Sequence, residues 1–238
     1  SEILAAAMQD YKRAIVIGSK QTYGKGTVQN IVDLNRMIKA NTNGDMGAFK
    51  FTTQKYYRIN GGSTQLEGVK SDVVVPGRFS YIEMGEREQD NPLEWDEIEP
   101  ANYTVWQNSF NYETIIENSK SRLNSSLEIK LIDENARWIK TIRDNDVYQL
   151  NFDKYSQNID LNELESKRFE DLSDYQSDLT FEPLLYELPI MEQDSVFKIN
   201  RNRWHENLAK DIYMEEALNV LNDLKNSYST NNTAQLKD

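Results

Sequence analysis

A lysine between two glycines is the feature of this 238-residue sequence whose chemistry is easiest to name. Residues 15–30 read IVIGSKQTYGKGTVQN, so an apolar β-branched run leads into a polar loop and then to Lys25, between Gly24 and Gly26. A strand followed by a glycine-rich loop with a lysine is typical of phosphate-binding loops. Three roles are open for Lys25: to bind a phosphate, to transfer a proton, or to occupy a turn.

The spacing argues against a phosphate-binding loop. That pattern places four residues between its glycines and follows the lysine with Ser or Thr. Here five residues separate Gly18 from Gly24, and Gly26 follows the lysine. The next residues also have the character of a strand, so no helix N-terminus would face an anion.

A lysine serves as a general base only where its surroundings disfavour the charged form. The ordinary lysine pKa lies near 10.4, and burial in an apolar site lowers it. Flanking glycines allow close packing, and Tyr23 and Val28 are candidates for apolar walls. Such a lysine accepts the proton of a serine hydroxyl in Ser-Lys hydrolases, which need no histidine. From spacing alone, a simple turn lysine remains the commoner outcome.

The composition argues against several other kinds of site. The sequence has no cysteine, which excludes disulfides, thiolate nucleophiles and cysteine-bound zinc. His205 is the single histidine, and its place on a predicted helix indicates a half-packed surface residue. The carboxylates of residues 81–100 lack the regular spacing of cation ligands. We therefore expect no metal and no cofactor.

Charge is unevenly distributed along the chain. Residues 1–80 carry a formal charge of +5 and residues 81–238 one of −17, which indicates two regions with different tasks. The acidic region argues against nucleic acid as a partner, because phosphate contacts need clustered Lys and Arg. The sequence begins at Ser1 inside a predicted helix, without Met, and we interpret it as a fragment of a longer protein.

Periodicity predicts an α+β fold in two parts. A helix over residues 1–13 and several strands predict a mixed unit over residues 1–80. The predicted strands are β-branched or alternate with period two, and they cover residues 14–18, 27–34, 47–59 and 69–76.

The second part is predicted to be helical. Residues 81–100 hold eight carboxylates and two prolines and predict an acidic linker. Residues 101–228 repeat apolar side chains at helical spacing, which predicts a helical domain interrupted by a strand-like stretch at 147–152. The polar residues 229–238 predict a disordered tail.

Specific motifs resemble one protein family. The stretch SEILAAAMQDYKRAIVIGSKQTYGKGTVQ resembles the active-site segment of the carboxy-terminal processing, or tail-specific, proteases, which are serine peptidases with a Ser-Lys pair. The similarity continues through QKYYRINGGSTQLEGVKSDVVVP, and then NPLEWDEI and LIDENARWIK resemble the helical C-terminal extension of the long periplasmic members. The resemblance covers essentially the whole chain. It implies the C-terminal half of a mixed α/β protease domain followed by a mainly helical domain.

The resemblance also implies roles for individual residues. Lys25 matches the general base of the family, and Gln29 matches the glutamine that orients this lysine in some members. Asp10 matches an aspartate important in the long members, with either a chemical role or a structural one in fixing the helix against the lysine loop. Ser1 and Glu2 match the end of the family's S-A-S-E segment.

The family's nucleophile is the first serine of S-A-S-E, and Ser1 aligns with the second. The resemblance therefore places the nucleophile two residues before this sequence, and we expect the fragment alone to be inactive. Ser1 itself is a weaker candidate nucleophile, because a chain terminus is poorly held. The loop at residues 19–23 is one residue longer than is usual in the family.

Taken with these matches, the resemblance implies a Ser-Lys serine endopeptidase that cleaves proteins near their C-terminal tails in the bacterial periplasm or cell envelope. Its expected partners are protein or peptide substrates, recognised through their tails, and an adaptor protein. The alternative is a non-catalytic role, in which the helical region is an interaction module that docks partner or adaptor proteins.

Overall fold

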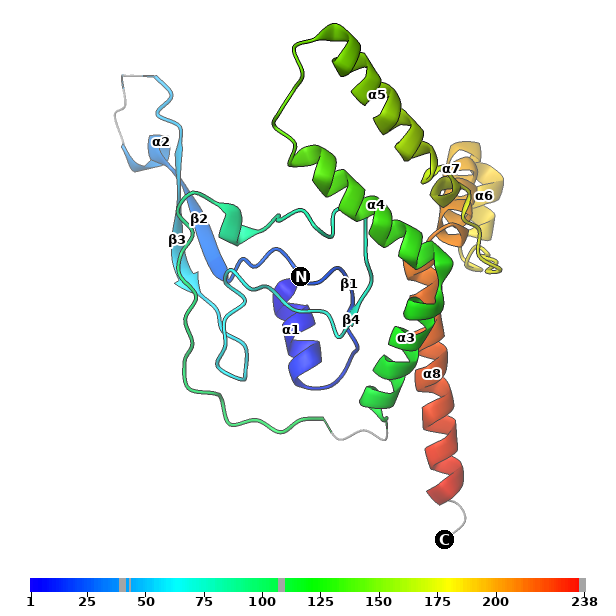
Figure 1. Ribbon diagram of the computed structural model, residues 1–238. Helices are drawn as coiled ribbons and strands as arrows, with labels where there is room; N and C mark the ends of the chain where they lie inside the picture. Colours follow the sequence, from blue (N-terminus) through cyan, green and yellow to red (C-terminus); the bar gives the residue numbers. More distant parts are fainter. Residues whose placement is uncertain (39–41, 43, 107–109, 236–238) are drawn as a thin grey trace. The chain divides into compact units, whose positions relative to one another are not determined.

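The computed structural model describes residues 1–38, 42, 44–106 and 110–235 (Figure 1). Contacts divide the chain into two compact units. Unit 1 comprises residues 1–16, 20–71 and 83–107, and unit 2 comprises residues 17–19, 72–82 and 108–238. The combination of helices and short strands confirms the predicted α+β class.

Unit 1 begins with helix α1 (Glu2–Asp10), whose sequence EILAAAMQD is rich in the best helix former. The helix is shorter than the range of residues 1–13 that periodicity predicts. It ends because Lys12 adopts a left-handed conformation, with φ of 52°, which closes a helix by turning the chain away from its axis.

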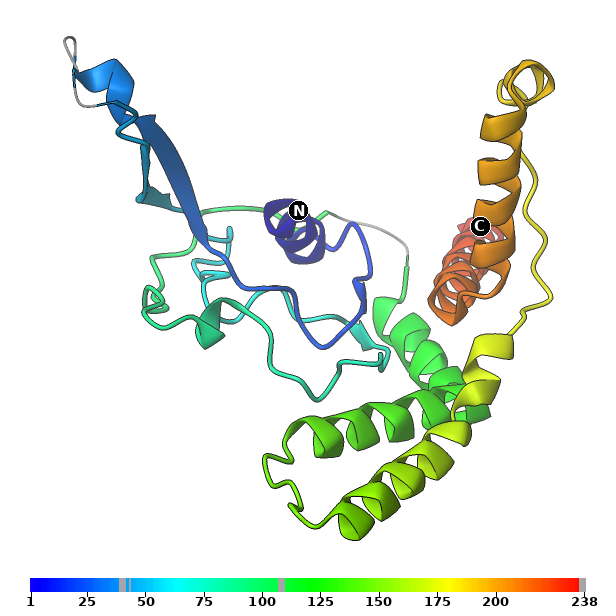
Figure 2. The same ribbon diagram turned by 90° about the horizontal axis from the view of Figure 1, so that it is seen from above.

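Strands β2 (Thr27–Asp33) and β3 (Ala48–Lys55) form an antiparallel pair in unit 1. Both lie within predicted strands. Figures 1 and 2 show a long ribbon with the short helix α2 (Leu34–Met37) at its far end. Because β2 follows directly after the loop of residues 22–26, which we call the lysine loop, the pairing of this ribbon decides where the residues beyond Lys25 lie.

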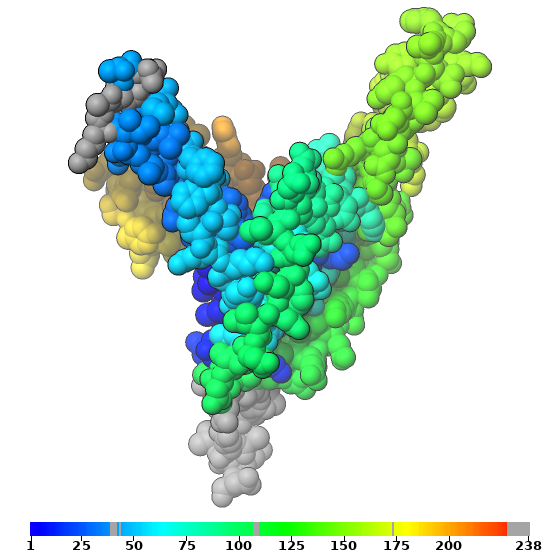
Figure 3. Space-filling model, turned by 90° about the vertical axis from the view of Figure 1, so that its left-hand side faces the viewer, coloured from blue at the N-terminus to red at the C-terminus, as the bar shows by residue number. Residues whose placement is uncertain are grey.

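Residues 86–101, which we call the strap, pack along unit 1. The strap contains one short 3-10 helix, η1 (Glu86–Glu88), and is otherwise irregular. Two of its backbone N–H groups donate to residues after β3: Ile98 to the Gly61 oxygen and Ala101 to the Ile59 oxygen, both at 2.9 Å. Figure 3 shows this green stretch against cyan residues. Much of the range predicted to be an acidic linker is thus hydrogen-bonded to the unit that carries Lys25.

Unit 2 contains one short parallel pair of strands, β1 (Ile17–Gly18) and β4 (Val73–Val74). They fall inside the predicted strands at residues 14–18 and 69–76 but are much shorter. The side chain of Val73 is fully buried and that of Val74 is half exposed, as the alternation of a strand requires.

The rest of unit 2 is mainly helical. Its helices are α3 (Tyr112–Ser125), α4 (Leu127–Arg143), α5 (Phe152–Lys167), η2 (Glu170–Asp174), α6 (Leu188–Gln193), α7 (Ser195–Ala209) and α8 (Ile212–Gln235). Helix α3 packs along α8 (Figure 1). The apolar core of these helices includes Ile115, Leu123, Ile129, Ala136 and Val220. Among the described residues, no helix is both long and apolar enough to cross a membrane.

The predicted strand at residues 147–152 is wrong. Residues 147–151 are irregular and α5 begins at Phe152. The side chain of Asn151 accepts a hydrogen bond from the Lys154 N–H and caps the helix. Val147 and Tyr148 are exposed, so the alternation of this stretch does not bury one face as a strand would.

Local capping also divides a helical stretch near the end of the chain. Helical spacing over residues 202–227 predicts one helix, whereas the structure has α7 and α8 with a break between them. The Asp211 carboxylate accepts from the Tyr213 N–H at 2.9 Å and the Met214 N–H at 3.2 Å, and so starts α8. Helix α8 continues through residues 229–235 of the predicted disordered tail, and residues 236–238 lie outside the described part of the chain.

An ion cluster joins α3 to α8. The Arg122 guanidinium contacts Glu216 at 2.7 Å and Asp223 at 2.8 Å, and the Ser119 hydroxyl donates to Glu216 at 2.6 Å. The Glu216 side chain is only 6% exposed. A carboxylate this deeply buried depends on its partners, because charge is costly to remove from water.

The Arg122→Leu substitution should lower the free energy of unfolding of the chain by about 3 kcal/mol, because it leaves the Glu216 carboxylate buried without its cation. Chemical denaturation followed by far-ultraviolet circular dichroism measures the effect. Arg203→Leu, at an exposed position of α7, is the control and should change it by less than about 0.5 kcal/mol. Equal effects of the two substitutions would contradict this role of the cluster.

Candidate active site

The two glycines beside Lys25 let the lysine loop, residues 22–26, lie directly against residues 63–68. The Leu66 N–H donates to the Gly24 oxygen at 2.8 Å, and the Gly26 N–H donates to Gln65 Oε1 at 2.9 Å. A Cβ atom at Gly24 would lie 2.9 Å from the Leu66 carbonyl carbon, and one at Gly26 would lie 2.6 Å from the Gln65 nitrogen. Gly24 also has a φ of +89°, a region that favours glycine. Both glycines therefore serve close backbone packing.

The first residue of α1 holds the other side of this loop. The Glu2 carboxylate accepts hydrogen bonds from the Gly24 N–H at 2.7 Å and the Lys25 N–H at 3.0 Å, and also from the Thr22 hydroxyl. Neighbouring Ser1 is exposed and its side chain makes no cap hydrogen bond. Sequence comparison groups Ser1 with Glu2, but only Glu2 contacts the lysine loop through these bonds.

The side chain of Lys25 is half-buried and points to Gln29. Lys25 Nζ lies 2.7 Å from Gln29 Oε1, and Gln29 Nε2 donates to Thr52 Oγ1 at 3.5 Å. The Tyr56 hydroxyl donates to the Lys25 carbonyl oxygen at 2.5 Å. Burial raises the pKa of Tyr56, which keeps this hydroxyl protonated as a donor. The structure thus brings together the two residues that the family motif pairs.

An irregularity in the ribbon sets the position of Gln29. In the β2–β3 register, Val28 pairs with Gln54 but Gln29 pairs with Thr52, so Thr53 is an extra residue on β3. Such a bulge changes the direction of side chains. Here it places the Thr52 hydroxyl opposite the Gln29 amide.

Asp10 pairs with Arg58 and not with the lysine loop. Its carboxylate accepts from Arg58 at 2.5 Å and 3.0 Å, and its side chain is only 6% exposed. Arg58 also donates to Gln9 Oε1 at 3.0 Å. This ion pair fastens the end of α1 to the segment after β3, whereas Glu2 fastens the start of α1 to the lysine loop.

Some contacts at the site differ from those expected from sequence. Tyr23 and Val28 do not form apolar walls: they are 47% and 39% exposed. Val28 follows the buried Thr27 along a strand and so faces the opposite side. The sequence does not assign roles to Tyr56, Arg58 or Gln65, although all three belong to the stretch QKYYRINGGSTQLEGVKSDVVVP, which resembles the family.

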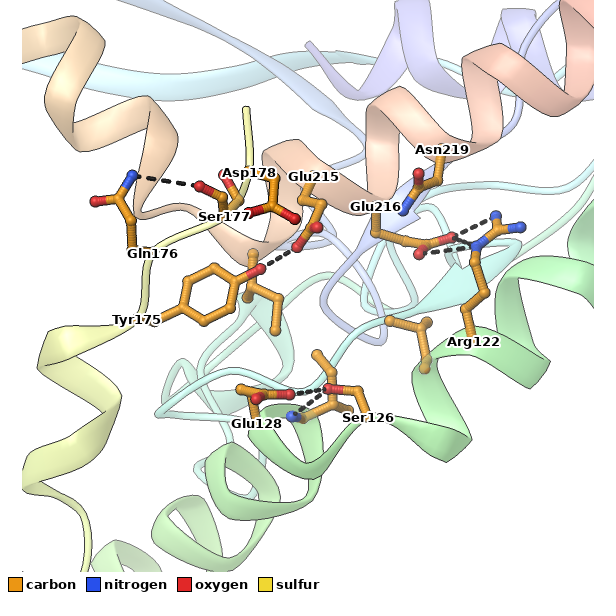
Figure 4. Close-up of a pocket in the computed structure, with 13 residues that line it drawn as sticks. Arg122, Ser126, Glu128, Tyr175, Gln176, Ser177, Asp178, Glu215, Glu216 and Asn219 are labelled. Atoms are coloured by element: carbon orange, nitrogen blue, oxygen red, sulfur yellow. Dashed lines mark hydrogen bonds and ion pairs between the residues drawn. The ribbon is translucent and has the colours of Figure 1, made fainter. Parts of the chain in front are cut away.

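Unit 2 has a cavity of about 350 Å³ between α3, α4, α8 and residues 175–178 (Figure 4). Its polar side chains largely bind one another. Arg122 contacts Glu216, the Tyr175 hydroxyl donates to Glu215, and Ser126 donates to Glu128 at 2.9 Å. Burial, followed by the bond to Glu215, raises the pKa of Tyr175. These polar contacts connect the segments that line the cavity, so we interpret its role as structural.

The single histidine, His205, does not line this cavity. His205 lies on α7 with its ring centroid 5.4 Å from that of Trp204. Across the described ranges, no group of three or more His, Cys, Asp and Glu side chains is arranged to hold a metal ion. Lys25 with its fixed neighbours is therefore the strongest candidate site for chemistry.

Both parts of the chain match known families. Residues 1–75, which contain the lysine loop, match Peptidase family S41. Residues 79–226 match the C-terminal domain of tail specific protease (DUF3340). Because the second match covers more than half of the chain, the chain belongs to this family of tail specific protease C-terminal domains.

Two curated proteins give the same result. The chain is 50% identical over 103 residues to a tail-specific protease of Haemophilus influenzae, which is 43% of this chain and 14% of that protein. It is 44% identical over 75 residues to a carboxy-terminal-processing protease of Bartonella bacilliformis, 32% of this chain and 15% of that protein. The resemblance to tail-specific proteases is confirmed, and the match spans about a seventh of each relative's length.

The packing of the lysine loop predicts that alanine lowers the free energy of unfolding at Gly26 but changes it little at Gly62. Gly26→Ala should lower the free energy of unfolding by about 2 kcal/mol, because its Cβ would collide with the Gln65 backbone. Gly62→Ala is the matched control: its Cβ would lie 3.4 Å from the end of the Asn60 side chain, which can move. Thermal and urea denaturation measure both. A Gly26→Ala protein as stable as Gly62→Ala would show that the loop does not need this close approach.

Proposed function

We propose that this chain is part of a serine-type endopeptidase that cleaves proteins near their C-terminal tails, with Lys25 as the general base. The observation that carries this proposal is the 2.7 Å contact between Lys25 Nζ and Gln29 Oε1, on a loop that Glu2 and Tyr56 hold by its backbone. The names of the two relatives support the reaction and the kind of substrate.

The geometry suits a lysine that accepts a proton. In its neutral amine form, Lys25 donates one N–H to Gln29, and its lone pair remains available. A serine Oγ attacks the carbonyl carbon of the scissile peptide while its proton passes to Lys25 Nζ. Lys25 then returns that proton to the leaving amine, and water hydrolyses the acyl-enzyme in the same way. No cofactor is needed for these steps.

The serine that Lys25 serves is proposed to belong to the parent protein. From the S-A-S-E motif we propose that it lies two positions before Ser1, three residues before Glu2, whose carboxylate binds the lysine loop. Glu2 would then set the distance between serine and lysine, because its carboxylate binds the backbone of Lys25 itself. We also propose, from the relatives, that the parent protein acts in the bacterial periplasm or cell envelope on substrates recognised through their tails.

A second candidate function follows from exposed apolar side chains on α5. Phe152, Leu161 and Leu164 are 79%, 56% and 64% exposed, and no residue of α5 is buried. A single exposed apolar side chain is normal on a protein surface, whereas several on one helix favour a contact with another protein. Leu161 and Leu164 are three residues apart and share one face of α5. This supports a docking role for the helical region, toward a substrate or an adaptor protein, beside the catalytic role of the parent.

Lys25→Ala in the parent protein should reduce peptide cleavage at least about a thousandfold, because the serine loses its base. The melting temperature should change little, since the Lys25 side chain is only half-buried. Lys20→Ala is the control, because Lys20 is an exposed lysine five residues earlier. Its cleavage rate should stay within about twofold of the unsubstituted protein. Turnover retained by Lys25→Ala would refute the assignment of Lys25 as base.

Leu161→Ser combined with Leu164→Ser tests the docking role in the parent protein. If α5 contacts protein partners, cleavage of a folded protein substrate should fall several-fold while cleavage of a short peptide stays unchanged. Lys154→Ala, an exposed polar position of the same helix, should alter neither rate. If the double variant cleaved the folded substrate at the unsubstituted rate, or lost activity equally on both substrates, this second function would lose its support.

A further inference from the structure

The side chain of Gln65 joins the lysine loop to the strap. Gln65 is completely buried, and both ends of its amide are used. Its Oε1 accepts from the Gly26 N–H at 2.9 Å, and its Nε2 donates to the Leu93 oxygen at 3.0 Å. Gly26 is the residue after Lys25, and Leu93 lies in the middle of the strap. One amide therefore bridges two segments far apart in sequence.

Other strap contacts reach the same few residues around the lysine loop. The Glu86 N–H donates to the Tyr23 oxygen at 2.9 Å, and Gln89 donates to the Tyr23 hydroxyl at 2.9 Å. Arg87 donates twice to the Leu66 oxygen, at 3.0 Å and 3.2 Å. The strap thus binds both Tyr23, which lies in the lysine loop, and Leu66, which follows Gln65.

Further along, the strap is fixed to the segment that carries Gln65. The Trp95 indole N–H donates to the Ser63 oxygen at 3.0 Å, and Lys55 forms an ion pair with Asp96 at 3.0 Å. All these residues lie in unit 1. By sequence, however, the strap falls within residues 79–226, which match the C-terminal domain family.

We propose that Gln65 is a positioning residue for Lys25, and that through it the strap of the C-terminal domain family holds the lysine loop in its working geometry. The inference rests on the proposed function of Lys25. Gln65 acts on the backbone at Gly26, while Glu2 acts on the backbone at Lys25, so the loop is held from two sides. Loss of the amide leaves a buried N–H of Gly26 and the Leu93 oxygen without this partner, and the loop is then free to shift.

The first test measures the coupling in the present chain, without any assay of activity. Gln65→Met keeps the length of the side chain and removes both hydrogen bonds. Amide hydrogen exchange at Gly26 should become at least about tenfold faster. The surface substitutions Arg87→Ala and Trp95→Phe, made together on the strap, should accelerate exchange at Gly26 by a smaller factor. Lys70→Ala, at an exposed lysine paired with Glu67, should leave it unchanged.

The second test measures kcat and KM in the parent protein with a short peptide substrate. Gln65→Met should lower kcat about tenfold with KM within about twofold, after correction for the fraction of folded enzyme. The strap double variant, which alters exposed side chains, should lower kcat in the same direction and guards against misfolding of Gln65→Met. A merely structural role would lower the folded fraction and leave the corrected kcat unchanged.

The outcomes separate this inference from the function on which it rests. Unchanged Gly26 exchange in both variants would overturn it. An unchanged corrected kcat in both, with Lys25→Ala inactive, would overturn the positioning role and leave the proposed function standing. Full turnover in Lys25→Ala would overturn the proposed function and this inference together.

Discussion

The carboxylate of Glu2 is the contact on which the candidate site depends. It accepts hydrogen bonds from two successive backbone N–H groups of the lysine loop and from the Thr22 hydroxyl. Hydrogen bonds to an ionised acceptor are about twice as strong as neutral ones. The carboxylate lies at the N-terminal end of α1, where the helix dipole also favours negative charge. The loop conformation is therefore tied to the start of this helix.

The other contacts act as supports for this one. Asp10 and Arg58 fix the far end of α1, so the helix that carries Glu2 is held at both ends. Gly24 and Gly26 let the loop approach residues 63–68. The bulge in the β2–β3 ribbon then places Gln29 and Thr52 beside the Lys25 side chain. Backbone contacts thus position a flexible side chain that has few contacts of its own.

Part of this arrangement was predictable from sequence because it is local. Gln29 lies four positions after Lys25 in an extended segment, so their side chains share one side. The β-branched and alternating runs indicated β2 and β3, and helical spacing indicated the helical domain. The helix boundaries were less accurate, because single residues set them: Lys12 ends α1, and Asp211 starts α8.

The remaining features depend on contacts between distant parts of the chain. The strap is rich in carboxylates and resembles a solvated linker, yet backbone groups and the Gln65 amide bind it to unit 1. No periodicity encodes such pairing. The exposure of Tyr23 and Val28 was likewise not predictable from sequence, because it depends on which face of the ribbon is covered.

The most direct test of the central claim is a crystal structure of the parent protein with a bound peptide, in which the distance from Lys25 Nζ to the nearest serine Oγ is measured. Our account predicts a serine Oγ within about 3.2 Å of Lys25 Nζ and close to the scissile carbonyl. A bound peptide whose scissile bond lies far from Lys25, with no serine hydroxyl within hydrogen-bond reach of Nζ, would contradict it.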